Sequence, residues 1–541
     1  MSDASQALRS PTQREALGNS GHSDREGNLG RAFSDLAACF PSESFREGQY
    51  EALEIIHDAF VNRGRRFVVA ELPTGIGKSH IAIALAKFYG RAHVLTVQKI
   101  LQAQYEASFP SLVYSMSGRG AYTCRQDSKL SCAQGPCRRS KLIRCPDCPY
   151  KAALARAHAS PITVHNFDSY YYQNKALPYA PRDILIVDEA HNLEQRYLSF
   201  MSFTISNRKD PNLDIPEFNS APQYKEFLRQ QRDEIDNNII GLEDQDTLTA
   251  SELAYLEEAR ELSTKLTIFL ARIETTEYVV DYESKEWQAV TFRPVFVGSY
   301  VIENLFPAGE RALMLSATIL DKTMFCRSVG LDPKDVEFIQ MDSYFPVRNR
   351  PIIRRYVGSM AFKEINDSLP KAVRALRAIL DKFPDKRGIV QTHSERIANY
   401  IQQNLGYEPR LTFRRDYKTV DDMLVAHAAK EGSFIVASGL REGLDLTGDL
   451  SRVQVIMKVP YPDLGDKRTK RRKDLDASWY GVQTALSFVQ MIGRSVRSSS
   501  DKALTYILDS SFEMFYRMNR RFIPRYIREA IDERAPSDFS D

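Results

Sequence analysis

Short apolar runs alternate with longer amphipathic stretches along most of the chain. Apolar runs at residues 66–72 and 92–97 enclose a helical pattern from Lys78 to Phe88. Strands of a parallel sheet are buried on both faces, so they appear as nearly continuous apolar runs, and helices connect them. The pattern therefore predicts an α/β fold with parallel sheets.

A second series of the same kind begins near Ile352 and continues to the end of the chain. Its candidate strands lie at residues 388–392, 433–438, 453–459 and 504–509. A chain of 541 residues exceeds what one hydrophobic core usually supports. We therefore predict two α/β domains, each with a parallel sheet.

Two segments interrupt the first series. One is rich in Gly, Ser, Arg and Cys and has little apolar periodicity, and the other is charged and mainly helical, with hairpin-like strands near its end. The N-terminal residues are polar and lack periodicity, which is typical of a mobile tail. The predicted organisation is a tail at 1–31, a first domain in three parts at 32–110, 151–195 and 297–320, a cysteine-rich insert at 111–150, an insertion at 196–296, and a second domain at 321–541.

Composition is that of a soluble enzyme, with 43% hydrophobic and 26% charged residues. The net charge of +3 is too small to argue for nucleic-acid binding, so local clustering must carry that argument. The basic run at 467–473 suits either phosphate contacts or a solvated loop. No apolar stretch has the length of a membrane span or the form of a secretory signal. We expect no membrane contact, no secretion and a location in the cytoplasm, or in the nucleoid or nucleus.

The segment Leu72-Pro-Thr-Gly-Ile-Gly-Lys-Ser79 follows a predicted strand and opens a predicted helix. Backbone N–H groups from Gly75 to Ser79 can hold phosphate at such a helix start, because unpaired donors and the helix dipole favour an anion there. Lys78 is positioned to reach the β and γ phosphates, and Ser79 to bind Mg²⁺. Glycine usually stands where this chain has Leu72. The flanking strand and helix nevertheless favour a P-loop.

The segment Asp183-Ile-Leu-Ile-Val-Asp-Glu-Ala-His191 is an apolar strand that ends in two carboxylates. Asp188 is expected to bind Mg²⁺ through water, and Glu189 to orient and deprotonate an attacking water molecule. A solvated acidic turn does not explain the apolar run before it. The segment therefore predicts the acidic half of a nucleotide-hydrolysing site.

Two further motifs follow. Ser316-Ala-Thr318 ends an apolar run, and Gln490-Met-Ile-Gly-Arg-Ser-Val-Arg497 lies in the second series after the loop 439–445. Arg494 and Arg497 are three residues apart, so on a helix they share a face and can point at a γ-phosphate across a cleft. Alone, these arginines are usually solvated charges. The accompanying motifs favour a catalytic role.

Five of the seven cysteines fall within 25 residues. In a reducing compartment, such a group indicates a metal site rather than disulfides. The spacing Cys145-x-x-Cys148 is typical of zinc, whereas the other gaps are irregular for a zinc ribbon or finger.

The order of these motifs resembles superfamily 2 helicases, and the cysteine insert between P-loop and DEAH box makes the chain similar to the iron-sulfur helicases of the XPD/DinG type. The resemblance covers about residues 40–515 and implies that the two α/β domains are RecA-like P-loop domains. The segment 45–49 looks like the family's adenine-side motif, 188–192 like its DEAH-plus-Asn box, and 490–497 like its motif VI. The insertion at 196–296 lies where the family carries its Arch domain.

The resemblance implies roles for individual residues. Lys78, Asp188, Glu189, Arg494 and Arg497 are implied in catalysis. His191, Ser316 and Thr318 are implied in coupling hydrolysis to movement. The implied nucleotide-binding residues are Gln49, Thr74, Gly75, Ile76, Gly77, Lys78, Ser79, Asp445 and Gln490.

The implied cofactors are ATP, Mg²⁺ and a [4Fe-4S] cluster. Cys124, Cys132, Cys137 and Cys148 are the implied cluster ligands, Cys145 is an alternative ligand, and zinc is an alternative metal. The implied activity is ATP-dependent movement along single-stranded DNA, generally 5′ to 3′, with unwinding of forked DNA. The alternatives are a DNA-stimulated translocase that does not unwind and a non-catalytic, metal-stabilised DNA-binding scaffold.

Overall fold

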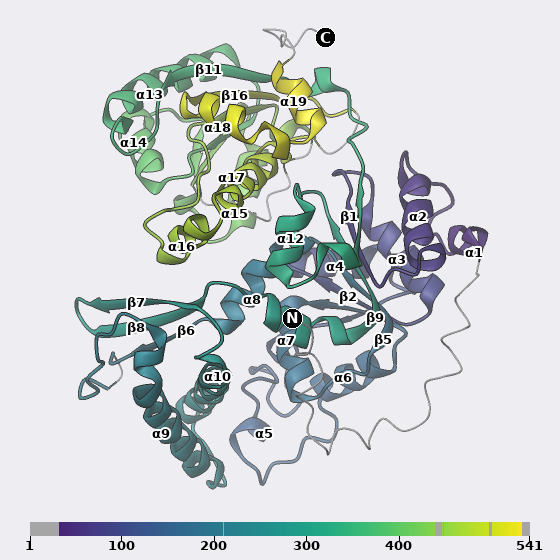
Figure 1. Cartoon of the computed structure of the whole chain (residues 1–541), viewed down its shortest axis with the longest axis vertical. Coiled ribbons are helices and arrows are strands. Elements are labelled where there is room, and N and C mark those ends of the chain that lie inside the picture. The colour runs from purple at the N-terminus through teal and green to yellow at the C-terminus, as the bar shows by residue number, and fades with distance from the viewer. Residues whose placement is uncertain (1–31, 209, 439–445, 447, 497–499, 533–541) are drawn as a thin grey trace.

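The structure is a computed structural model that describes residues 32–208, 210–438, 446, 448–496 and 500–532. Two α/β domains lie one above the other in Figure 1, and a third unit of long helices and a small sheet lies beside the lower domain. The predicted α/β class with two RecA-like domains is confirmed. Within the residues described, no helix is both long and apolar enough to span a membrane.

The first domain is built on a seven-stranded sheet in which every strand pairs in parallel. Its strands are β1 (Phe67–Glu71), β2 (Ala92–Thr96), β3 (Tyr114–Met116), β4 (Ile162–Asn166), β5 (Arg182–Val187), β9 (Gly309–Ser316) and β10 (Val336–Gln340). The order across the sheet is β10-β1-β9-β5-β2-β4-β3. Its helices are α1 (Phe33–Ala38), α2 (Gln49–His57), α3 (Lys78–Tyr89), α4 (Lys99–Ser108), α6 (Pro149–Ala159), α7 (Phe167–Ala176), α8 (Leu193–Met201), α11 (Gly298–Asn304) and α12 (Lys322–Val329).

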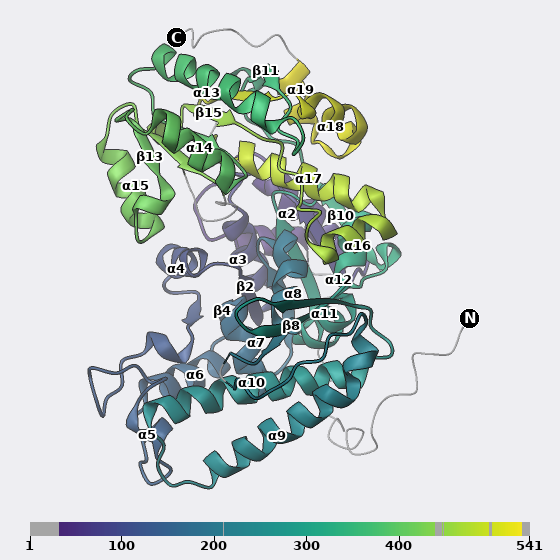
Figure 2. The ribbon, with the colours of Figure 1, turned by 90° about the vertical axis from the view of Figure 1, so that its left-hand side faces the viewer.

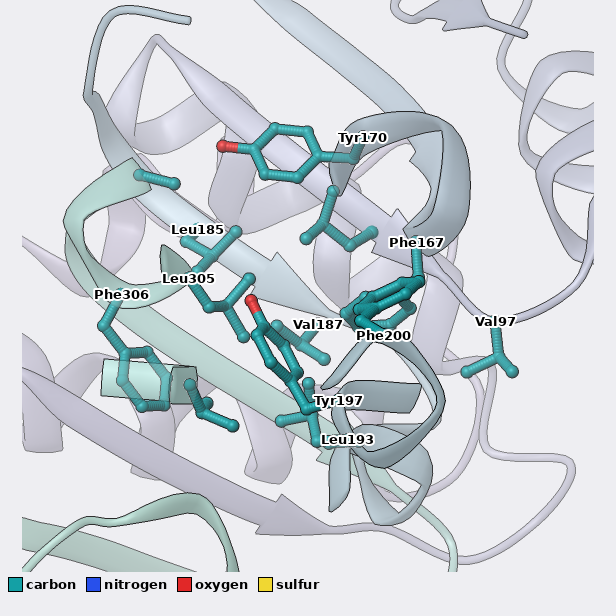
Figure 3. Close-up of a cluster of buried hydrophobic side chains, with 14 of the residues drawn as sticks. Val97, Phe167, Tyr170, Leu185, Val187, Leu193, Tyr197, Phe200, Leu305 and Phe306 are labelled. Carbon is teal, nitrogen blue, oxygen red and sulfur yellow. The ribbon is translucent and has the colours of Figure 1, made fainter. Parts of the chain in front are cut away.

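Both faces of this sheet are buried, which explains the continuous apolar runs. Val68 belongs to one hydrophobic cluster and its neighbour Val69 to the cluster on the opposite face. Figure 3 shows the second cluster, in which Tyr197 and Phe200 of α8 pack toward Val187 of β5. The helix after the DEAH segment is thus fixed to the strand that carries it.

The second domain has six parallel strands. They are β11 (Ile352–Gly358), β12 (Gly388–Gln391), β13 (Leu411–Phe413), β14 (Phe434–Ala437), β15 (Val453–Ile456) and β16 (Leu504–Asp509), in the order β11-β16-β15-β12-β14-β13. Its helices are α13 (Ile365–Lys382), α14 (Glu395–Leu405), α15 (Val420–Ala429), α16 (Lys467–Leu475), α17 (Ala477–Ile492), α18 (Ser511–Asn519) and α19 (Arg525–Asp532).

The boundary predicted at residue 321 is wrong. Helix α12 and strand β10 follow it, and β10 pairs with β1 in the first sheet. The crossing between the domains therefore lies between Gln340 and Ile352. Strand β10 is a half-exposed edge strand with only three apolar residues, so its apolar signal is weak.

The insertion combines two long helices with a small antiparallel sheet. Its elements are β6 (Phe203–Ser206), α9 (Lys225–Glu243), α10 (Ala250–Arg272), β7 (Tyr278–Ser284) and β8 (Gln288–Pro294), with strand order β6-β8-β7. Figure 2 shows α9 and α10 running side by side. Phe269 of α10 packs on Phe203 and Phe292 of the sheet, so helices and sheet share one core.

The insert predicted at 111–150 begins too early, because β3 pairs with β4 in the first sheet. The cysteine segment that follows β3 has little regular structure, containing the one-turn helix α5 (Pro136–Arg139) and an isolated bridge between Thr123 and Ser131. It contacts the insertion directly. Arg138 forms an ion pair of 2.7 Å with Glu257 of α10, and Ser140 forms an antiparallel bridge with Thr247. The insertion and the cysteine segment therefore touch at their outer ends.

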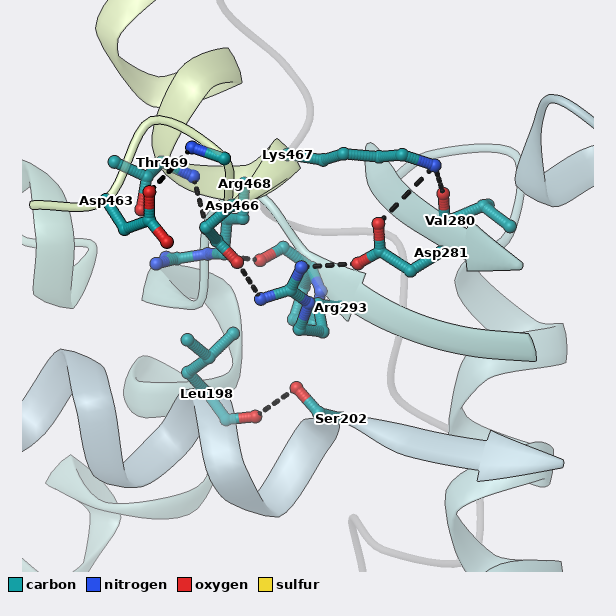
Figure 4. Close-up of polar contacts among 12 residues, drawn as sticks. Leu198, Ser202, Val280, Asp281, Arg293, Asp463, Asp466, Lys467, Arg468 and Thr469 are labelled. Carbon is teal, nitrogen blue, oxygen red and sulfur yellow. Dashed lines mark hydrogen bonds and ion pairs between the residues drawn. The ribbon is translucent and has the colours of Figure 1, made fainter. Parts of the chain in front are cut away.

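The basic run at 467–473 forms helix α16 rather than a loop. Arg468 and Arg472 are buried and both form ion pairs with Glu194 of α8, at 2.6 and 2.5 Å. Figure 4 shows the neighbouring contacts, in which Arg293 of β8 bridges Asp466 and Asp281. This group of ion pairs, hereafter the α16 contact, joins the second domain to the first domain and the insertion.

Candidate nucleotide site and cysteine cluster

The P-loop follows β1 and leads into α3. Its conformation requires glycine, because Gly75 and Gly77 have φ of 82° and 86°, in the left-handed region. Gly77 is the N-cap of α3, so the first backbone N–H groups of that helix face the loop. A Cβ atom at Gly77 would lie 2.4 Å from Nε2 of Gln49, so Gln49 packs directly against the loop. This arrangement forms an anion cradle bordered by Gln49.

The DEAH segment lies at the carboxyl end of β5, and β9 alone separates this strand from β1. Glu189 has φ of 53°, an unusual conformation for a residue other than glycine. Its carboxylate lies 3.9 Å from Nζ of Lys78 and 3.3 Å from Nδ1 of His191. The fold thus brings together the P-loop lysine and the DEAH carboxylate, which are more than 100 residues apart in sequence.

Asp188 is buried and accepts a hydrogen bond of 3.0 Å from the Tyr105 hydroxyl of α4. Burial, with the adjacent charge of Glu189, raises the pKa of Asp188 to about 6. A divalent cation would offset this cost by neutralising two neighbouring carboxylates. Together with the hydroxyl of Ser79 on α3, the donor set is all oxygen and fits Mg²⁺.

The Ser-Ala-Thr motif is bonded to both domains. The Ser316 hydroxyl lies 2.9 Å from Nδ1 of His191 and also accepts a bond from the N–H of Thr318. Across the cleft, Nε2 of Gln490 lies 3.4 Å from the Thr318 hydroxyl. The motif therefore connects the DEAH segment to α17 of the second domain.

Two buried glutamines hold the end of α17. Gln391 of β12 donates to the carbonyl of Met491, and Gln454 of β15 donates to the carbonyl of Ile492, at 3.1 and 3.2 Å. These bonds satisfy carbonyls that a helix terminus leaves unpaired. Arg494, two residues further along, is 5% exposed.

A cavity of about 270 Å³ separates the two domains. Thr74, Glu189 and Thr318 line it from the first domain, and Gln490 and Arg494 from the second. Predicted site residues from both domains thus meet at one cleft. The other two predicted residues of the second domain, Asp445 and Arg497, lie outside the described residues.

The five clustered cysteines form one connected group of thiols. Cys148 interacts with Cys132 and Cys145, while Cys132 also lies near Cys124 and Cys145 near Cys137. Four of them are buried in the same hydrophobic cluster and Cys137 packs against it. Among the described residues, no three His, Cys, Asp or Glu side chains are arranged to hold a single metal ion.

Cys148, the last of the five clustered cysteines, lies at the start of helix α6. Burial acts to raise the pKa of Cys148, but the N–H groups of Lys151 and Tyr150 at the start of α6 outweigh it and lower the pKa below its usual value. By contrast, burial beside Cys148 and Cys137 raises the pKa of Cys145 to about 11. A sulfur-only donor set with one thiolate-favouring position suits an iron-sulfur cluster.

The three consecutive tyrosines of α7 mostly pack rather than face solvent. Tyr170 is buried, and Tyr171 stacks on Phe200 with ring centres 4.2 Å apart. Tyr172 is 43% exposed and donates its hydroxyl to Glu261 of α10. Of the three side chains, only Tyr172 is exposed enough for a nucleic-acid base to stack on it.

Some site residues were not identified from sequence. Tyr105 donates a hydrogen bond to Asp188, which is 83 residues away in sequence. Glu194 forms ion pairs with both buried arginines of α16. No local motif marks either residue. For Glu194, the i, i+4 spacing of Arg468 and Arg472 on a charged helix was the available signal, since it places both on one face.

Comparison with known proteins agrees with this geometry. Residues 390–530 match the helicase C-terminal domain family, and residues 42–211 match the family of the type III restriction enzyme res subunit. An XPD helicase structure superposes with a TM-score of 0.64 at 14% identity, covering 89% of this chain and 98% of that one. The two family matches lie in the two α/β domains, and the chain shares the fold of the XPD helicase structure.

Two further relatives have similar coverage. The structure of Xpd4 from S. tokodaii superposes with a TM-score of 0.56 at 15% identity, covering 90% of this chain and 99% of that one. A probable ATP-dependent helicase of Methanocaldococcus jannaschii is 23% identical, covering 87% of this chain and 92% of the relative. The resemblance therefore extends over both domains and the insertions between their parts.

Proposed function

We propose that this protein is an XPD-like, ATP-dependent DNA helicase that moves 5′ to 3′ along single-stranded DNA and opens forked duplexes. The observation that carries the proposal is the cleft, which Glu189 of one domain lines together with Gln490 and Arg494 of the other, while Lys78 lies beside Glu189. Hydrolysis between two domains is suited to a motor, because the site is complete only when the domains approach.

Each residue at the cleft has a separate task. Lys78 neutralises the β and γ phosphates, and Glu189 accepts the proton of the attacking water. Arg494 stabilises the charge that develops on the γ-phosphate in the transition state. Mg²⁺, held through Ser79 and Asp188, supplies electrostatic stabilisation of the phosphate oxygens when bound.

Movement follows from the contact between the Ser-Ala-Thr motif and α17. Thr318 meets Gln490, and Ser316 meets His191 beside Glu189. Loss of the γ-phosphate removes the anion that Arg494 and Lys78 share, so the two domains separate. Repeated closing and opening ratchets the strand.

We further propose that Cys124, Cys132, Cys137 and Cys148 hold a [4Fe-4S] cluster, with Cys145 as the alternative ligand. The thiol-rich core of this segment supports an iron-sulfur cluster, and zinc is the competing metal. When bound, the cluster supplies a rigid centre to a segment with little secondary structure.

A strand-displacement assay beside a DNA-stimulated ATPase assay tests the function. We expect ATP-dependent displacement on forks with a 5′ single-stranded arm. ATPase activity without strand displacement would indicate a translocase. If both activities were absent, the DNA-binding scaffold would be the remaining alternative. Substituting an RNA strand tests whether DNA is the preferred track.

Metal analysis of anaerobically purified protein tests the cofactor. We expect iron and sulfide with a broad visible absorbance. Stoichiometric zinc without iron would contradict the cluster and leave the motor assignment intact.

A further inference from the structure

Glu71 is a buried carboxylate to which the proposed mechanism gives no task. It is the last residue of β1, directly before the P-loop, and is 4% exposed. Burying a carboxylate is costly unless donors are arranged around it. Its partners therefore indicate what the position is for.

One oxygen of the Glu71 carboxylate accepts two hydrogen bonds, and both donors lie in the turn after the Ser-Ala-Thr motif. Oε2 of Glu71 accepts the backbone N–H groups of Ile319 and Leu320, at 2.9 and 2.6 Å. Oε1 accepts Nε2 of Gln340, at 3.1 Å, from the end of β10. The carboxylate thus ties the turn to the strand that carries the P-loop.

The turn itself has an unfavourable backbone conformation. Leu320 has φ of 66°, in the left-handed region that a branched side chain seldom adopts. Such a conformation persists only where surrounding contacts hold it. The two bonds from Glu71 are charge-assisted and stabilise this conformation.

The turn lies beside the residues that connect the two domains. Thr318, the residue before Ile319, meets Gln490 of α17, and Ser316 meets His191. The Leu72 N–H also donates to the Ser316 carbonyl at 2.8 Å. A shift of the turn would therefore move Thr318 relative to both the P-loop and the second domain.

We propose that Glu71 is a positioning residue of the ATPase cycle, which holds the Ile319–Leu320 turn so that Thr318 meets Gln490 when the cleft closes. This inference rests on the proposed ATPase. Glu71 acts through Thr318 and does not touch the nucleotide phosphates.

The geometry predicts that glutamine can replace Glu71. Both backbone bonds converge on a single oxygen, which an amide also provides, and the new amide nitrogen would face Gln340, whose side-chain amide can turn to present its oxygen. Burial raises the pKa of Glu71, so a neutral side chain removes a desolvation cost. Alanine provides no acceptor.

The test compares Glu71→Ala, Glu71→Gln and the control Glu337→Gln in the full chain. Glu337 lies on β10 and forms an ion pair with Arg63 away from the cleft. We measure kcat and KM of the ATPase with single-stranded DNA, and nucleotide affinity with a fluorescent ATP analogue. For Glu71→Ala we expect kcat to fall about 10- to 100-fold while affinity changes by less than about threefold, because a small displacement of a positioning group is costly to turnover. Glu71→Gln should recover most of kcat, and Glu337→Gln should match the wild type.

A double-mutant cycle with Thr318→Ala tests the route. If Glu71 acts through Thr318, the double variant should lose no more turnover than Thr318→Ala alone. Should Glu71→Ala fail to fold, Glu71→Asp, whose side chain is one methylene shorter, takes its place. We then expect the same result, a fall in kcat with little change in nucleotide affinity.

Unchanged kcat, equal losses of kcat and affinity, or additive losses in the cycle would overturn the inference. A wild-type chain without DNA-stimulated ATPase would instead overturn the proposed function.

Discussion

The nucleotide cleft and the cysteine segment both include parts of the first domain, yet different forces organise them. The cleft lies at the ends of hydrogen-bonded parallel strands and of α17, so the sheets position its side chains without a ligand. The cysteine segment has one short helix and an isolated bridge, and its interior consists largely of thiols. The sheets organise the cleft, whereas the cysteine segment is the region that the proposed cluster would organise.

This difference predicts that the two regions fail separately. Loss of a cleft side chain should stop chemistry and leave the fold intact, because the sheets remain. Loss of a thiol should disorganise the segment and leave the cleft, because no strand end of the cleft belongs to it. Each prediction below tests that separation.

The largest effect is expected at the cleft. Lys78→Ala should abolish ATPase by removing the phosphate-neutralising ammonium, and Glu189→Gln should retain ATP binding but lose on the order of 10² to 10⁴ in hydrolysis. Arg494→Ala should also spare nucleotide binding and lose turnover. Steady-state ATPase with fluorescent-nucleotide binding measures both quantities. Near-normal turnover would contradict the P-loop assignment, and a loss confined to DNA binding would contradict the role given to Arg494.

The second effect concerns the thiols. Cys148→Ser or Cys137→Ser should bleach the visible absorbance and abolish strand separation, while single-strand-stimulated ATPase survives. Cys39→Ser is the matched control, since this half-buried cysteine lies outside the group. Cys145→Ser identifies the fourth ligand by whether absorbance is kept. Full unwinding by a cluster-free Cys148→Ser protein would make the segment a structural insert only.

The third effect tests the α16 contact. Glu194→Ala leaves Arg468 and Arg472 buried without their carboxylate, so we expect unfolding free energy to fall by about 3 kcal/mol. Glu277→Ala is the control, because its ion pair with Arg471, which is also on α16, is about half exposed and should contribute less than about 1 kcal/mol. Chemical denaturation measures both. Equal losses would contradict the difference in burial.

The smallest effect is a pH dependence beneath α6. Burial lowers the pKa of His93 to about 2 and that of His165 to about 3, so both are neutral when folded. Their stabilising contribution is complete above pH 6.5, the unfolded pKa, and is lost as pH falls below it. Lowering the pH from 7.5 to 5.5 should therefore reduce the free energy of unfolding by about 1.4 kcal/mol for each of the two histidines. In His93→Asn the difference in stability between these pH values should shrink by that amount; an unchanged difference would contradict the neutral state.

The sequence predicted the α/β class and the cleft well because these depend on local signals. Apolar runs mark strands buried on both faces, and glycines with positive φ mark the P-loop. Longer-range pairings left no such signal. Strand β10 joins the first sheet at an edge, Glu71 bonds a turn 248 residues away, and the basic run of α16 uses two arginines internally. Composition alone does not distinguish a buried ion pair from a phosphate contact.

The α16 contact changes how the second domain is expected to move. The chain crosses between the sheets once, between Gln340 and Ile352, and a body attached at one point can turn in any direction. The ion pairs of Arg468 and Arg472 supply a second attachment, on the helix that follows the DEAH box. Two attachments define a line, so closure becomes rotation about a single axis while both hold. Part of the precision of the motor would then lie in a pivot distant from the nucleotide.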